Sequence, residues 1–117
     1  MSSDLTVGGG GEVFNDSVTG ANPVAFSTGA IGSPFTLNSI RVVLSSVGAT
    51  SESVTVTINS GRGATYDSEV LSENMLGQNG VIQTFPEIEC EVGDSIDVAY
   101  PNSDESTVTT ILTLGGL

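Results

Sequence analysis

The feature that most constrains the fold of this chain is an alternation of apolar and polar side chains with a period of two residues. In the clearest run, Val54, Val56 and Ile58 alternate with Thr55 and Thr57. Successive side chains of a strand point to opposite faces, so this pattern predicts a strand with one buried face. Such runs recur between clusters of Gly, Pro, Asn and Asp. The sequence therefore predicts an all-β fold, an antiparallel β-sandwich of jelly-roll-like form with seven to eight short strands.

The other runs extend this prediction along most of the chain. Further strands are expected at residues 23–27, 35–44, 66–73, 81–85, 87–92, 96–100 and 107–114. Within the strands, every second side chain is assigned to the core. The side chains expected to be buried are Val54, Val56, Ile58, Ile96, Val98 and Leu112.

One strand changes its inward parity. Phe35 and Leu37 occupy odd positions, whereas Ile40 and the apolar residues after it occupy even positions. A β-bulge inserts one extra residue into a strand and would explain this change. The pattern therefore predicts a bulge near Asn38 and Ser39.

Two further segments interrupt the regular pattern. Pro86 is expected to end the strand that begins at Val81, because proline cannot donate to a sheet ladder. Residues 66–73 fit a strand, but they also fit the start of a short helix that Asp67 caps and Gly77 ends. Both interpretations of this segment remain open at the level of sequence.

The first part of the chain differs from the rest. Residues 1–21 contain the run Gly8–Gly11 and only scattered apolar side chains, among them Val13 and Phe14. This composition predicts a flexible arm or irregular lead-in with room for one short strand, followed by a single sandwich domain over residues 22–117. If the segment is a docking arm rather than a frayed end, Val13 and Phe14 are candidate interface residues.

The composition argues against catalysis. The chain has no His, no Lys and no Trp, and it carries 14 acidic side chains against two arginines, for a net charge of −12. Most catalytic sites use a group that titrates near neutral pH, an activated nucleophile, or a metal held by His and Cys. We therefore expect a protein that is not an enzyme, with no cofactor and no metal site.

The same charge balance limits the partners. Nucleic-acid binding and attachment to anionic membranes both require basic side chains, so neither is expected. No apolar run approaches the ~20 residues of a membrane-spanning helix. The start of the sequence lacks the basic and apolar regions of a secretory signal, which favours synthesis in the cytoplasm.

Three side chains stand out against this background. Arg62 lies in a glycine turn and is expected to pair with Asp67 or another nearby carboxylate, whereas Arg41 should point outward from its strand, either at an interface or on plain surface. Both arginines are candidate interface residues.

Cys90 has no partner for an intrachain disulfide. Alternation points it inward together with Val92, which favours a buried apolar role over a reactive thiol or an intersubunit bridge.

Two acidic segments could in principle bind a cation. Three glutamates at alternate positions from Glu87 to Glu91 should share one strand face, which fits a solvated face or a charged edge strand better than a metal site. The loop 102–105 offers four oxygen-bearing side chains and could bind calcium together with Asp94 or Asp97. It lacks the spacing of a helix-loop-helix calcium site, so an ordinary polar turn is favoured.

The stretch from residue 35 to residue 114 resembles small β-sandwich virion proteins of tailed phages, of the capsid decoration or cement type. The segments that carry the resemblance are 53–58, 63–67 and 92–102. It implies a virion component made in the host cytoplasm that binds the major capsid protein on the capsid surface as a homo-oligomer, and it implies no catalytic residues. The alternative from a different class is an adhesive or fibre-tip module that binds a host glycan or protein. The lack of Trp and the aromatic content of 5% count against a glycan platform.

Overall fold

A computed structural model of the chain describes residues 12–116. In this part of the chain eight strands form two antiparallel four-stranded sheets, ordered β2-β9-β4-β7 and β3-β8-β5-β6, which confirms the predicted sandwich. The strands are β2 (Glu12–Val18), β3 (Val24–Ser27), β4 (Phe35–Leu44), β5 (Ser53–Asn59), β6 (Ser68–Asn74), β7 (Gly80–Cys90), β8 (Ser95–Tyr100) and β9 (Val108–Gly115).

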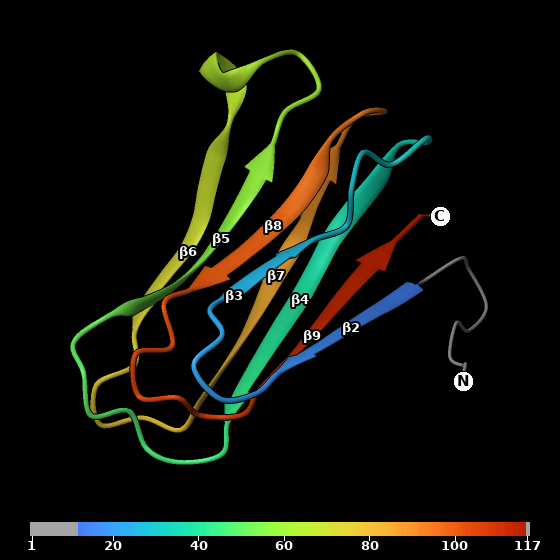
Figure 1. Cartoon of the computed structure of the whole chain (residues 1–117). Coiled ribbons are helices and arrows are strands. Elements are labelled where there is room, and N and C mark those ends of the chain that lie inside the picture. The colour runs from blue at the N-terminus through green and yellow to red at the C-terminus, as the bar shows by residue number, and fades with distance from the viewer. Residues whose placement is uncertain (1–11, 117) are drawn as a thin grey trace.

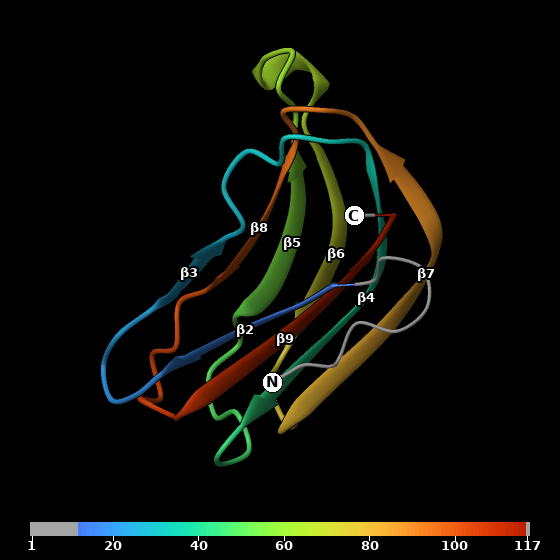
Figure 2. The same ribbon diagram turned by 90° about the vertical axis from the view of Figure 1, so that its right-hand side faces the viewer.

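The two sheets form stacked layers whose strands run in similar directions (Figures 1 and 2). At the upper end of Figure 1, the chain connects β3 to β4, β5 to β6 and β7 to β8. At the lower end it connects β2 to β3, β4 to β5, β6 to β7 and β8 to β9. These two groups of turns are called the upper and lower ends below.

The core lies between the sheets, where the inward side chains of both layers meet. The six side chains named above as expected to be buried are all buried, and Val54, Val56, Ile96 and Leu112 are completely inaccessible to solvent. The remaining buried apolar side chains include Leu37, Ile40, Val42, Met75, Tyr100, Val108 and Leu114. The period-2 pattern therefore predicted the core correctly.

The predicted bulge in β4 is confirmed. The register of β4 against both β7 and β9 shifts between Leu37 and Ser39. Asn38 is the extra residue against β9, whereas against β7 it lies opposite the three residues 85–87. The neighbouring strand β7 is irregular at the same level, where Phe85 turns into the core and Glu87 adopts a φ of 51°. This irregularity divides β7 into a lower and an upper half.

The prediction that Pro86 ends a strand is wrong. β7 runs continuously from Gly80 to Cys90 and passes through Pro86 at the bulge. β7 lies at the edge of its sheet, with β4 as its neighbour on one side. An edge strand tolerates proline because half of its backbone groups have no ladder partner.

The structure also decides the alternatives at residues 66–73. A short 3₁₀ turn covers Ala64–Tyr66, and β6 follows from Ser68 to Asn74, so the strand is correct and the longer helix is wrong. Asp67 does not cap a helix, because its carboxylate instead accepts the backbone N–H of Ser60 at 2.8 Å.

The N-terminal part contributes to the sandwich. β2 pairs with β9 along its whole length, from Glu12 opposite Leu114 to Val18 opposite Val108. The sheet therefore begins before residue 22, where the sequence analysis places the start of the sandwich. The glycine run at residues 8–11 lies outside the described residues.

Candidate interaction surfaces

The outer side of the β2-β9-β4-β7 sheet presents one row of side chains from each strand. Cross-strand pairing places Asn15, Ile111, Arg41 and Ile82 side by side across the four strands. The neighbouring rows are set by the same registers. We call the surface formed by these three rows the carboxylate-free face, and it comprises Val13, Asn15, Ser17, Ser39, Arg41, Val43, Gly80, Ile82, Thr84, Thr109, Ile111 and Thr113.

The charge on this face is unusual for the chain. It carries no Asp or Glu, although the whole chain has 14 acidic residues. Its one cation, Arg41, is exposed and has no carboxylate partner within residues 12–116, where the ion pair found is the one between Arg62 and Glu91. Ile82 beside it is 70% exposed, and a shallow hollow of about 310 Å³ lies next to both side chains. The carboxylate-free face thus presents apolar, hydroxyl and guanidinium groups. It is also the part of the surface where the carboxylates of this chain repel another acidic protein least.

The acidic side chains of β7 begin beyond its bulge. Glu89 pairs with the outward Thr36, so it projects from the same side of the sheet near the upper end. Glu87 lies in the irregular segment, and Glu91 follows the last residue of the strand. The predicted stripe of three glutamates on one regular strand face is therefore wrong, because the bulge and the strand end separate them.

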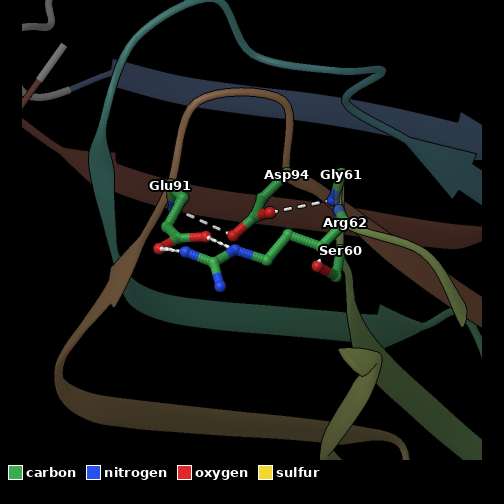
Figure 3. Close-up of polar contacts among 5 residues, drawn as sticks. All are labelled: Ser60, Gly61, Arg62, Glu91 and Asp94. Carbon is green, nitrogen blue, oxygen red and sulfur yellow. Dashed lines mark hydrogen bonds and ion pairs between the residues drawn. The ribbon is translucent and has the colours of Figure 1, made fainter. Parts of the chain in front are cut away.

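The upper end is closed by a polar clasp between the two sheets (Figure 3). Asp94 is 6% exposed and accepts the backbone N–H of Gly61 at 3.0 Å and that of Glu91 at 2.9 Å. The Arg62 guanidinium donates two bonds of 2.8 Å to the Glu91 carboxylate. The clasp therefore ties the β5–β6 connection to the β7–β8 turn, and Arg62 pairs with Glu91 rather than with Asp67.

A cleft opens beside this clasp, between the free edges of β6 and β7. Its lining combines the apolar side chains of Ile58, Val70 and Ile88 with polar and charged ones, among them Ser60, Ser68, Arg62, Glu89, Glu91 and Asp94. Its volume is about 460 Å³. Arg62 is already paired with Glu91, so the guanidinium that lines this cleft has its carboxylate partner within the chain.

The lower end is held by side chains of the β8–β9 loop. Asp104 accepts the backbone N–H of Ala49 at 2.7 Å and the hydroxyl of Thr50 at 2.7 Å. These bonds, led by that from the Thr50 hydroxyl, lower the pKa of Asp104. Glu52 in turn accepts the backbone N–H and the hydroxyl of Ser103.

This geometry corrects the calcium alternative considered for residues 102–105. Asp94 belongs to the clasp at the upper end, whereas the loop lies at the lower end, so the two cannot share an ion (Figure 1). The side chain of Asn102 is buried and bonded to backbone groups. Within residues 12–116, no cluster of three or more Asp, Glu, Cys or His side chains has the arrangement of a metal site.

The four residues predicted from sequence as interface candidates do not form one surface. Arg41 and Val13 both belong to the carboxylate-free face, and Val13 is 38% exposed. Phe14 points the other way and packs against the core. Arg62 lies in the clasp at the upper end. Ile82 and Ile111 were not among the predicted interface residues, although the position of Ile111 next to the inward Leu112 indicates an outward side chain.

Cys90 is 5% exposed, as alternation predicted, but its neighbour Val92 is 59% exposed. β7 ends at Cys90, so Val92 lies in the turn and no longer follows the inward parity. Burial, with a smaller contribution from the charge of Asp94, raises the pKa of the Cys90 thiol from 9.0 to about 11.

We expect Cys90 to react very slowly with a thiol reagent in the folded protein. A pKa raised by about two units leaves roughly a hundredfold less thiolate at a given pH, and burial restricts access further. Labelling should accelerate strongly in denaturant, which mass spectrometry can follow over time. Rapid labelling of the native protein would contradict the register of β7.

No helix within residues 12–116 is long and apolar enough to cross a membrane.

No family model matches the chain, and no curated protein sequence matches it. Solved structures with a similar outline include the core of Drosophila NLP, reported with pentamer formation and histone binding, at 9% identity over 87% of this chain and 96% of that one, with a TM-score of 0.49. A second is Aeromonas hydrophila PliG, a periplasmic inhibitor of g-type lysozyme, at 12% identity over 97% and 91%, with a TM-score of 0.39. A third is from the infectious bursal disease virus Gx strain, at 10% identity over 89% of this chain and 32% of that one, with a TM-score of 0.36. At these values the likenesses carry no information about function.

Proposed function

We propose that this chain is a non-enzymatic structural protein that decorates a virus shell, of the capsid decoration or cement type. It would sit on the outside of the shell and bind the major capsid protein through the carboxylate-free face. The sequence resemblance supports the assignment to a virion. The distribution of charge over the sandwich supports the choice of face.

The charge distribution is the observation that carries the proposal. In a chain with a net charge of −12, most surfaces repel other acidic proteins. The carboxylate-free face instead offers exposed Ile82, partly exposed Ile111 and the unpaired Arg41, with no carboxylate among the residues that form it. Depletion of charge around apolar side chains and an arginine is typical of the centre of a protein interface.

The rigidity of the sandwich suits this role. Side-chain bonds to backbone hold both ends, through Asp94 at the upper end and Asn102 at the lower end. A preorganised face loses little conformational entropy on binding. When many copies bind one shell, their individually weak contacts add up to a large stabilisation of the shell.

The experiment uses empty shells of the virus that encodes this chain, prepared without it. Added purified protein should co-sediment with the shells and raise the temperature at which they fall apart, since a ligand that binds only the assembled state stabilises it. Failure to bind these shells would contradict the proposal. Binding to intact host cells instead would favour the adhesive alternative.

A further inference from the structure

Within residues 12–116 the two sheets end in four edge strands, and three of these are protected against pairing with another chain. β3 is only four residues long. β6 carries Glu69 and Glu73 and has a register shift against β5. β2 carries Asp16. Short length, bulges and charged side chains are the devices by which natural proteins prevent edge-to-edge association.

The fourth edge, β7, is protected over its upper half alone. Pro86, the irregularity at Glu87, and Glu89 all lie in that half. The lower half, Gly80–Thr84, contains no charge, no proline and no register shift against β4. It is therefore the stretch of free edge, within the described residues, that lacks every one of these devices.

The backbone of this stretch is oriented for pairing. Asn79 directs its carbonyl toward β4, where it accepts the N–H of Leu44 at 2.8 Å. Because backbone groups alternate sides along a strand, the N–H and C=O groups of Gly80, Ile82 and Thr84 point to the free edge. In agreement, the Thr84 carbonyl accepts a bond from the side-chain amide of Gln83 rather than from β4.

We propose that a second copy of this chain pairs with this edge, with the two β7 segments antiparallel about a two-fold axis at Ile82. Ile82 then faces Ile82 of the second copy, and Gly80 faces Thr84 of the second copy, as hydrogen-bonded pairs. The two sheets become one continuous sheet with Ile82 of both copies at its centre. A two-fold axis makes the same short segment serve as both donor and acceptor.

The two-fold match of this segment with itself points to another copy as the occupant, and the distribution of charge agrees with this position. Two molecules of net charge −12 repel each other, so they associate best where neither carries a carboxylate, and Gly80–Thr84 borders the carboxylate-free face. A basic partner would instead be attracted to the acidic upper half of β7. Pairing of so short an edge belongs to the small, transient class of interfaces, below roughly 1,200 Å². The dimer is thus concentration-dependent, and added salt strengthens it by screening the net repulsion.

The test is sedimentation velocity over a concentration series at low and at moderate salt. The parent protein dimerises as concentration and salt rise. Ile82→Lys places two like charges at the axis and weakens dimerisation about tenfold or more, whereas Val92→Lys makes the same charge change at an exposed turn and leaves it unchanged. Ile82→Pro removes an N–H that points away from β4, so it abolishes the dimer while the circular dichroism spectrum stays native.

A further variant separates edge pairing from contact between whole faces. Ile111→Asp lies two strands from the edge and leaves the edge dimer intact, but it would disrupt a face-to-face dimer. A protein that stays monomeric throughout the series, or a dimer that survives Ile82→Lys and Ile82→Pro, overturns the inference. The inference does not rest on the proposed function, since self-association is measured without shells.

Discussion

Replacing Asn102 by Ala is expected to lower the free energy of unfolding by about 3 kcal/mol. The Asn102 side chain is 1% exposed, and its amide nitrogen lies 3.1 Å from the carbonyl of Gly20 and 2.9 Å from those of Asn22 and Ser106. Its amide oxygen accepts the backbone N–H of Ser106 at 3.0 Å. Alanine leaves these backbone groups, of which those of Ser106 are buried, without their side-chain partner, and it also strains the backbone, since residue 102 has a φ of 56°.

The variant Asn102→Gly separates the two contributions. Glycine removes the same hydrogen bonds but adopts a positive φ without strain, so its loss should be about 1 kcal/mol smaller than that of alanine. Urea titration of the three proteins, followed by circular dichroism, measures both differences. Equal stability of the parent and the alanine variant would show that the Asn102 network does not hold the lower end together.

Leu112→Ala should lower the free energy of unfolding by about 3 kcal/mol as well, for a different reason. Leu112 is fully buried at the centre of β9, and truncation leaves a cavity between two tightly packed sheets. Its neighbour Ile111 points to the carboxylate-free face, so Ile111→Ala should cost less than about 1 kcal/mol. The same urea titration compares the two variants. Equal losses at these adjacent positions would contradict the inward and outward assignment of β9.

The most accurate part of the prediction from sequence was which side chains along a strand point inward and which point outward. Val54, Val56 and Ile58 alternate without interruption, and the change of parity after Leu37 correctly indicated a bulge. Alternation reports only which of two faces a side chain occupies. It could therefore identify the core, but it could not say which strands are neighbours.

The interaction surfaces depended on those neighbours. Arg41 and Ile82 are far apart in the sequence, and they meet because β4 pairs with β7. The pairing of Arg62 with Glu91 likewise requires two turns from different sheets to meet at the upper end. Pro86 misled the prediction because the tolerance of a strand for proline depends on whether the strand lies at an edge, which the sheet order decides.

Two aspartate substitutions, compared for their binding to empty shells, test directly whether the protein docks through the carboxylate-free face. Ile111→Asp places a carboxylate at the centre of the carboxylate-free face, and Thr57→Asp makes a closely matched change on the outer side of the β3-β8-β5-β6 sheet, in the row that already holds Asp97 and Glu69. If docking uses this face, Thr57→Asp co-sediments with empty shells like the parent protein, whereas Ile111→Asp loses most of its binding while remaining folded. Undiminished binding of Ile111→Asp, with loss of binding for Thr57→Asp, would contradict docking through the carboxylate-free face.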